Sequence, residues 1–157
     1  MATQTEGTYK VPGYETTFIT RAEMGDDALR ALTDRLISII PTFKGELVLQ
    51  EDWGTKRLAY KIEKETRGHY TYLVYTGDGN IVAEIERNLR MNDFVMRFLS
   101  VNLAKEFEQE SFMKRREEIK AQAKKREEER EARREEREAR RRSYEDSSDD
   151  MGADAGE

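Results

Sequence analysis

The chain has 157 residues, with 28 Lys and Arg, 33 Asp and Glu, one His and no Cys. Its charged fraction of 39% exceeds the roughly 25% usual for globular domains. This composition excludes disulfide frameworks, thiolate metal sites, cysteine nucleophiles and multi-histidine metal sites. No apolar run approaches the ~18 residues of a membrane span, and no apolar leader segment opens the chain, so we expect a cytoplasmic protein without a membrane partner.

The charges are unevenly distributed along the chain. Residues 1–104 hold 28 charged residues and 11 of the 14 aromatic residues, whereas residues 105–157 hold 33 charged residues. The first two-thirds can therefore bury a core, and the last third cannot bury one of its own. We expect a flexible arm at residues 1–12, a folded domain at 13–107, a charged helical extension at 108–144 and a disordered acidic tail at 145–157.

The first predicted elements are a strand and a helix. Residues 14–20 are rich in Thr and aromatic side chains, a composition typical of strands. Gly25 and the two aspartates after it suit a helix N-terminus. Pro41 ends this helix, and Gly45 suits the exit turn. The helix carries apolar side chains at helical spacing: Leu29, Leu32, Leu36, Ile39, Ile40 and Phe43.

The middle of the chain predicts a hairpin. Residues 46–50 alternate charged and aliphatic side chains, and residues 58–62 continue or resume that strand after Trp53. Residues 63–68 form a polar turn, and residues 69–76, with three tyrosines, form the next strand.

A second helix and a final strand complete the pattern. Apolar residues at every fourth position predict a helix from Ile81 to about Arg90, and residues 94–103 predict a strand. A split βαβ pair in this order forms a four-stranded antiparallel sheet with both helices on one face. We therefore expect an α+β fold, the ferredoxin-like plait, followed by the charged extension.

The helix-free face of such a sheet should carry polar residues at alternate positions. Several predicted strands instead carry neighbouring apolar residues, such as Phe18 with Ile19 and Phe98 with Leu99. We expect a partner, or the chain's own tail, to cover this face or a sheet edge. The alternative is that these are isolated apolar surface residues, which occur on any soluble protein.

Five short segments of the predicted domain resemble one family. They are residues 51–54 (EDWG), 58–62 (LAYKI), 69–70 (HY), 91–93 (MND) and 95–97 (VMR). In this order and spacing, over about residues 13–107, they resemble the bacterial small-subunit (30S) ribosomal protein S6 family. The chain departs from the family pattern at Lys61, where the family often has Pro, and at Glu63, where it often has a basic or small polar residue.

The resemblance implies a structural component of the small ribosomal subunit, with no reaction and no cofactor. It also implies pairing with ribosomal protein S18 and joint binding to the central domain of the small-subunit (16S) rRNA. The alternative is a free-standing plait domain that binds RNA only transiently. Residues 1–104 carry a net charge of −2, so we expect the basic partner to supply much of the phosphate neutralisation.

Phosphate contacts need cations held on rigid elements. The candidate rRNA-binding residues are Lys56, Arg57, Lys61, Lys64, Arg67, Arg87, Arg90 and Arg97. For any one of them, a solvated basic rim is the alternative. We expect Trp53 in the core, with base stacking as the alternative. The paired-Phe signature of RNA-recognition motifs is absent, which favours a protein partner for the sheet face. The candidate partner-face residues are Tyr70, Tyr72, Phe98 and Leu99.

The C-terminal third predicts an exposed helix. Residues 114–142 consist almost entirely of Lys, Arg, Glu, Gln and Ala, which are strong helix formers. Only Ile119 and scattered alanines are apolar, which gives no coiled-coil seam. Residues 111–144 carry a net charge of +5 and residues 145–157 one of −6. We expect this helix either to lie along ribosomal RNA or to be a solubilising extension without specific contacts.

No enzyme chemistry is predicted. A plait that hydrolyses acyl phosphates needs a glycine-rich anion cradle after its first strand, but residues 21–27 are acidic and contain a single Gly. Residues 77–80 (GDGN) lack the ligand spacing and the terminal Glu of a calcium loop. His69 lies in a tyrosine-rich strand and is expected to be structural. No catalytic set, metal site or small-molecule site can be identified.

Overall fold

The computed structural model describes residues 11–149, with side chains up to residue 141. The chain divides into two compact units, Met1–Phe107 and Glu108–Glu157. Most of the predicted N-terminal arm and the end of the predicted acidic tail lie outside the described residues.

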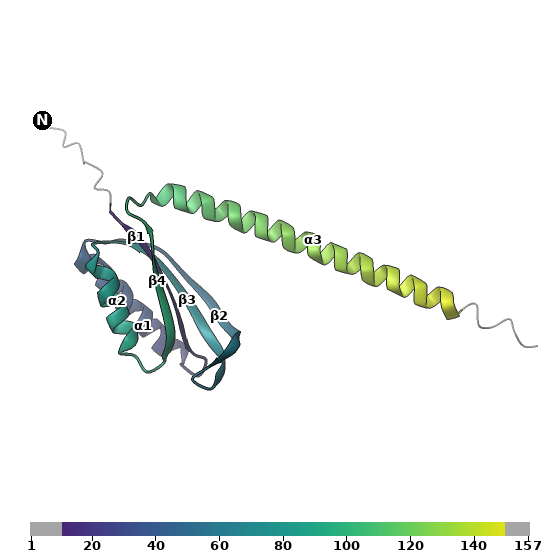
Figure 1. Ribbon diagram of the computed structural model, residues 1–157, viewed down its shortest axis with the longest axis horizontal. Coiled ribbons are helices and arrows are strands. Elements are labelled where there is room, and N and C mark those ends of the chain that lie inside the picture. Colours follow the sequence, from purple (N-terminus) through teal and green to yellow (C-terminus); the bar gives the residue numbers. More distant parts are fainter. Residues whose placement is uncertain (1–10, 150–157) are drawn as a thin grey trace, which may run out of the picture. The chain divides into compact units, whose positions relative to one another are not determined.

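The first unit contains a four-stranded sheet and two helices. Its elements are β1 (Gly13–Arg21), α1 (Asp26–Ile39), the 3-10 helix η1 (Ile40–Phe43), β2 (Leu47–Ile62), β3 (Glu65–Thr76), α2 (Asn80–Arg90) and β4 (Val95–Ala104). The strands form one antiparallel sheet in the order β2-β3-β1-β4, and α1 and α2 lie on one face of it (Figure 1). This confirms the predicted ferredoxin-like plait.

Local sequence explains where α1 begins and how the chain leaves η1. Asp26 and Asp27 occupy the first turn of α1, where unpaired backbone amides favour negative charge. Pro41 lies at the start of η1, where its missing N–H is tolerated, and Lys44 ends η1 with a φ of 54°. Gly45 then passes close to β3, because a Cβ there would lie 2.1 Å from a backbone carbonyl oxygen.

Side chains of β1 alternate between the two faces of the sheet. Tyr14, Thr16, Phe18 and Thr20 are buried, and the residues between them face the helix-free side. The Thr16 hydroxyl is hydrogen-bonded to the Tyr75 hydroxyl at 2.9 Å, which satisfies a polar group inside the core.

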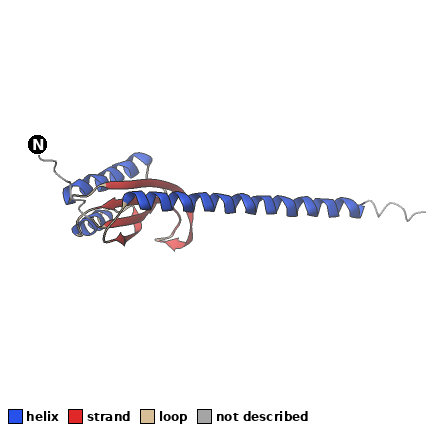
Figure 2. Cartoon of the chain, turned by 90° about the horizontal axis from the view of Figure 1, so that it is seen from above, coloured by secondary structure: helices blue, strands red, loops and turns tan. Residues whose placement is uncertain are grey.

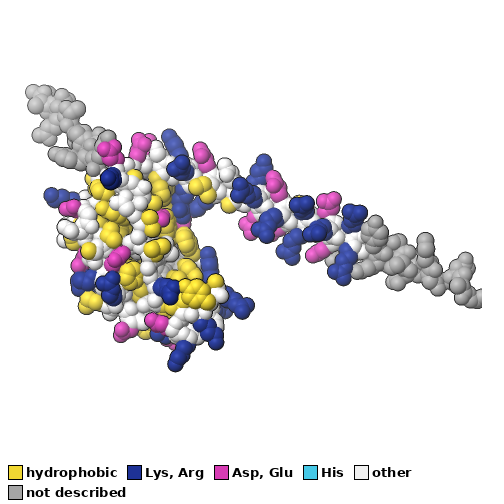
Figure 3. Space-filling view, viewed as in Figure 1, with side chains coloured by type: hydrophobic (Ala, Val, Ile, Leu, Met, Phe, Trp, Pro, Cys, Tyr) yellow, Lys and Arg dark blue, Asp and Glu magenta, His cyan; other side chains and the backbone are white. Residues whose placement is uncertain are grey.

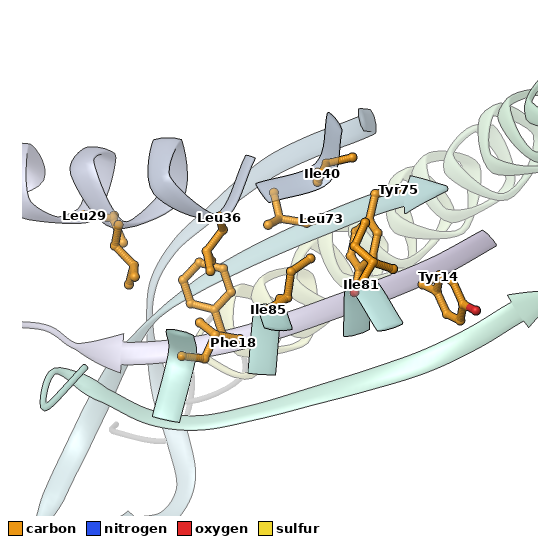
Figure 4. Packing of buried hydrophobic residues seen from close by; sticks show 11 residues of the cluster. Tyr14, Phe18, Leu29, Leu36, Ile40, Leu73, Tyr75, Ile81 and Ile85 are labelled. Carbon is orange, nitrogen blue, oxygen red and sulfur yellow. The ribbon is translucent and has the colours of Figure 1, made fainter. Parts of the chain in front are cut away.

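The main core lies between the sheet and the two helices (Figure 4). Leu29 and Leu36 from α1, Ile81 and Ile85 from α2 and Phe18 of β1 belong to one buried cluster, in which Leu36 and Ile85 lie beside Phe18. A side chain of this kind contributes about 1.5–3 kcal/mol when it is fully buried. The helical spacing of these residues in the sequence is thus explained by their shared core.

The β2–β3 hairpin has a tighter turn than predicted. β2 is one continuous strand, and Gly54, at a φ of 72°, lies at a bulge in its pairing with β3. The turn consists of Glu63 and Lys64, both at positive φ, as in the commonest two-residue hairpin turns. The longer predicted turn is wrong, because Arg67 lies inside β3, directly opposite Arg57.

The end of this hairpin lies over the helix-free face of the sheet. Leu58 and Ile62 of β2 form a second buried cluster with Met96 of β4, packed against Ile19 of β1. Gly68 lies beneath this cluster, and a Cβ there would be 2.5 Å from Ile19 Cγ2. The cluster therefore rests on a position where only glycine fits without displacement of a neighbour.

Two further contacts cover the ends of the helix-free face. At the hairpin end, the Arg21 guanidinium lies 2.6 Å from the Glu63 carboxylate and 3.5 Å from that of Glu65. At the other end, the Phe107 ring packs on Gly13, where a Cβ would lie 2.2 Å from the ring. We expected a partner or the C-terminal tail over this face; in the first unit, the hairpin and Phe107 cover its two ends.

The second unit consists of α3 (Gln109–Asp149), which Figure 2 shows as one unbroken helix. It continues to Asp149 rather than ending at residue 144. Its side chains from residue 117 to residue 141 are all exposed. Helix propensity, backbone hydrogen bonds and local ion pairs such as Lys124–Glu128, at 3.9 Å, maintain the helix in that stretch.

Candidate protein and RNA interface

The helix-free face is exposed on β4, between its two covered ends. Leu99 pairs with Thr17 and Val101 pairs with Glu15 on β1. The side chains of Leu99 and Val101 are 66% and 41% exposed, and β4 is an edge strand of the sheet. We call these two residues the exposed β4 surface. Apolar side chains on an edge strand are suited to contact with another protein.

Three of the four predicted partner-face residues lie on the helix-free side. Tyr70, Tyr72 and Leu99 alternate with core positions in their strands, whereas Phe98 pairs with Phe18 and packs against the main core. The assignment of Phe98 to the partner face is therefore wrong, because adjacent strand residues point to opposite faces. Tyr70 packs against the second cluster and Tyr72 is only 5% exposed, which leaves Leu99 as the accessible member.

Trp53 lies on the helix-free face and not in the core. Its ring is stacked on Tyr72, with centroids 5.1 Å apart, and its Nε1–H donates to Glu51 Oε2 at 3.0 Å. Lys56 Nζ lies 5.4 Å from the ring centroid. The predicted core position is wrong, because a register shift between Leu47 and Leu49 places Glu51 opposite Tyr72 on the helix-free face, and Trp53, two residues further along β2, lies on that same face.

The structure separates the predicted rRNA-binding cations instead of bringing them together. Lys56 and Arg97 lie on the helix-free face, Arg57 and Arg67 on the opposite face of the hairpin, and Arg87 and Arg90 on α2. Lys61 and Lys64 are exposed near the hairpin turn. Figure 3 shows dark blue side chains around the end of the plait that the hairpin forms.

Arg57 and Arg67 form a cross-strand pair of like charges. They are direct partners in the β2–β3 register, and both side chains are exposed. Like charges directly opposite one another destabilise an antiparallel pair. A phosphate held between the two guanidinium groups would relieve this repulsion, since each group can donate two hydrogen bonds to phosphate oxygens.

The two arginines of α2 already contact other side chains of the plait. Arg87 donates two hydrogen bonds to the Glu84 carboxylate, at 2.9 and 2.6 Å. These bonds, together with one from Asn88, lower the pKa of Glu84 to about 2, and the Glu84 carboxylate raises the pKa of Arg87. The Arg90 guanidinium lies 5.7 Å from the centroid of the Phe98 ring.

Sequence reasoning missed two exposed residues of this face. Val101 follows Leu99 by one alternation of β4, and the strand period identifies it once Leu99 is assigned to the helix-free side. Tyr60 is 60% exposed, and its hydroxyl accepts a hydrogen bond from Arg97. No local signal pairs Tyr60 with Arg97, because these residues meet only when the hairpin folds over the sheet.

His69 links two neighbouring strands. Its Nε2 lies 2.6 Å from Asp52 Oδ1, and its Nδ1 lies 3.3 Å from the Thr55 hydroxyl, both on β2. This agrees with the structural role expected for it. Within residues 11–149, no three His, Asp or Glu side chains are grouped so that they could hold a metal ion. No helix in that range is long and apolar enough to cross a membrane.

Known proteins match the chain over its plait. A family model described as ribosomal protein S6 matches residues 13–102. Small ribosomal subunit protein bS6 of Geobacter sulfurreducens is 48% identical over 93 residues, covering 59% of this chain and 80% of that protein. The bS6 protein of Geotalea daltonii is 47% identical over 93 residues, covering 59% of this chain and 73% of that protein.

A solved structure agrees with these sequence matches. The crystal structure of 30S ribosomal protein S6 from Thermotoga maritima matches with a TM-score of 0.57 and 27% identity, covering 72% of this chain and 99% of that chain. The matched relatives are ribosomal proteins of the small subunit and not enzymes, and such proteins reside on cytoplasmic ribosomes. This chain therefore belongs to the ribosomal protein S6 family of the small ribosomal subunit.

Proposed function

We propose that the plait joins the small ribosomal subunit by pairing with ribosomal protein S18 and binding the central domain of the small-subunit rRNA together with it. The exposed β4 surface carries this proposal. The plait covers both ends of its helix-free face but leaves Leu99 and Val101 exposed to solvent. A partner that covers them removes apolar area from water without disturbing the packing beside them.

Arg57 and Arg67 support contact between the hairpin and RNA phosphates. Their like-charge register is unfavourable in the free protein and becomes favourable when an anion lies between them. On the other face of the hairpin, the exposed Trp53 ring with Lys56 beside it offers an aromatic surface and a cation, the combination on which bases stack.

The charge of the plait argues that RNA binding depends on the partner. Residues 1–104 carry a net charge of −2, and the structure distributes their basic residues over separate surfaces. Only some of these basic residues can face one RNA surface at a time. A basic partner bound at β4 would supply the phosphate neutralisation that the plait lacks.

A matched pair of substitutions tests the partner surface. Leu99→Gln removes an apolar side chain that is 66% exposed on β4, and Met91→Gln removes one that is 65% exposed after α2. We expect Leu99→Gln to weaken S18 binding about tenfold or more in calorimetric titrations, because central apolar contacts dominate interface energies. We expect Met91→Gln to change it less than about twofold. Equal affinities for the two variants would contradict the proposed surface.

A second pair tests the RNA contact. The double variant R57Q/R67Q removes the cross-strand pair, and R30Q/R35Q removes the same charge from α1. We expect R57Q/R67Q to weaken binding of the S18 complex to the central-domain rRNA and to reduce its salt dependence, without lowering the stability of the free protein. Identical salt dependence in both double variants would show that this pair does not contact RNA.

A further inference from the structure

The arginines of α3 lie along one side of the helix. At about 100° of rotation per residue, nine of the ten arginines of α3 fall in a sector about 120° wide. These nine residues, which we call the arginine stripe, are Arg115, Arg116, Arg126, Arg130, Arg133, Arg134, Arg137, Arg140 and Arg141. No Asp or Glu of α3 falls in the same sector. All of the stripe except Arg116 is exposed, and Arg116 is half-buried.

The lysines of α3 lie outside this sector, among the glutamates. Lys114, Lys120, Lys124 and Lys125 all occupy the remaining part of the helix surface. Lys124 pairs there with Glu128 at 3.9 Å. The two kinds of cation are thus separated by position, so the net charge of the extension understates how positive one side of it is. Figure 3 shows Lys and Arg side chains following one another along α3.

Adjacent stripe residues also share small hollows on the helix surface. One is lined by Arg126, Glu129, Arg130 and Arg133, and the next by Arg133, Glu136, Arg137 and Arg140. Each hollow is lined by three arginines of the stripe and by one glutamate, which lies outside the sector. Neighbouring arginines in each hollow are three or four residues apart in sequence, so their backbone positions are spaced about 4.5–6 Å along the helix axis.

The separation of the arginines from the lysines and glutamates of α3 indicates a ligand with many phosphates in a row. Guanidinium groups bind phosphate oxygens through two parallel hydrogen bonds, whereas ammonium groups act as point charges. At 1.5 Å per residue, the stripe extends for about 39 Å from Arg115 to Arg141. The exposed part of α3 contains few apolar residues, of which Ile119 is the largest. A protein partner would need a buried apolar centre at its interface, which this surface does not offer.

We propose that the arginine stripe is a second RNA-binding surface, which lies along the phosphate backbone of an RNA duplex. This surface is separate from the hairpin contacts and needs neither S18 nor a particular base sequence, because it reads only backbone charge. It rests on the proposed function only for the identity of the RNA that it meets in the cell.

Two charge-matched variants of the full chain test this proposal. One replaces Arg126, Arg130, Arg133 and Arg137 by Gln, and the other replaces Lys114, Lys120, Lys124 and Lys125 by Gln. Each removes four positive charges from α3, and Gln has nearly the same helix propensity as Arg and Lys. The probe is a fluorescent 24-base-pair RNA duplex of arbitrary sequence, titrated at several salt concentrations.

We expect the arginine variant to bind the duplex at least about 30-fold more weakly than the unsubstituted chain at low salt. The slope of log affinity against log salt should fall by roughly three to four, since each of the four lost phosphate contacts removes about 0.9. The lysine variant should lose less than about threefold. Circular dichroism should show the same helix content in all three proteins.

Equal losses in the two variants would overturn the stripe, because they would show that total charge alone sets binding. Failure of the unsubstituted chain to bind the duplex would overturn it as well. The R57Q/R67Q variant separates this proposal from the previous one. It should bind the arbitrary duplex through α3 with its affinity reduced less than about threefold, whether or not the hairpin contacts ribosomal RNA.

Discussion

Phe18 in β1 and Ile119 in α3 are both large apolar residues, yet Phe18 is fully buried and Ile119 is 59% exposed. Around Phe18, side chains from two helices and neighbouring strands pack together across long sequence distances. In the exposed part of α3, ion pairs and backbone hydrogen bonds join residues only a few positions apart. The plait can therefore hold a surface of fixed shape, whereas α3 presents a line of charge.

The largest expected effect is on the free energy of unfolding, and it distinguishes the packed core of the plait from the exposed helix α3. Phe18→Ala should lower the free energy of unfolding by about 3–5 kcal/mol, because it leaves a cavity at the centre of the core. Ile119→Ala should change it by less than about 0.5 kcal/mol, because that side chain already contacts water. Urea unfolding followed by Trp53 fluorescence, which reports the plait, and by far-ultraviolet circular dichroism, which reports both units, measures the two effects. Similar changes in the free energy of unfolding for the two variants would contradict this difference between the plait and α3.

The next effect concerns a titratable group inside the core. Burial raises the pKa of the Tyr75 phenol to about 12, from a usual value of 10. The unfolded chain loses this proton first, so the stability from this group is complete below pH 10 and is lost as the pH rises towards 12. The loss should reach about 2–3 kcal/mol.

The variant Tyr75→Phe isolates this contribution. It should be less stable at pH 8, because the hydrogen bond to Thr16 is lost, but its stability should fall less steeply between pH 10 and 12. Unfolding free energies of the variant and of the unsubstituted protein, measured at four pH values between 8 and 12, give the difference. Parallel curves for the two proteins would show that Tyr75 ionises as freely in the folded state as in the unfolded state.

A smaller effect tests whether the second cluster is packed as closely as a core. Gly68→Ala places a methyl group 2.5 Å from Ile19 Cγ2 and 3.0 Å from Met96 Cε, so it should destabilise the plait by about 1–3 kcal/mol. Gly25→Ala is the control, since no atom lies within 4 Å of its added Cβ. If both variants unfold at the same urea concentration, the hairpin end is loose over the sheet.

The smallest effect concerns an exposed ion pair of the plait. Hydrogen bonds from Arg87 and Asn88 lower the pKa of Glu84 to about 2, below its usual value of 4.5. The stabilisation is therefore complete above about pH 4.5 and is lost as the pH falls towards 2. Glu84→Gln should flatten the dependence of the melting temperature on pH across this range, by a small amount because the pair is exposed to solvent. An unchanged pH profile would show that the pair does not contribute.

Local sequence patterns predicted the helices, because helix formation depends on residues that are close together in the sequence. Ile81, Ile85 and Leu89 recur at helical spacing, and α2 contains all three in its buried side. In α3, helix-forming residues alone indicated the element, although the helix continues to Asp149. A helix with one face towards the core can be predicted because its apolar residues repeat at the helical period. An exposed helix such as α3 can be predicted because nearly all of its residues are strong helix formers.

The surface details could not be predicted, because they depend on register. Glu63 and Lys64 carry no Asn-Gly signal, so the two-residue turn was missed, and with it the opposition of Arg57 and Arg67. Trp53 was misplaced for the same kind of reason. A one-residue bulge moves a side chain to another surface without changing the pattern of apolar residues around it.

The dependence of RNA binding on the partner tests the account most directly. A mobility-shift titration would use the central-domain rRNA with this protein alone, with S18 alone and with both. In moderate salt, where generic contacts from α3 are weakened, tight binding should occur only when both proteins are present, because the plait has a net negative charge and its exposed β4 surface is open to a partner. Equally tight binding by this protein alone would contradict the account.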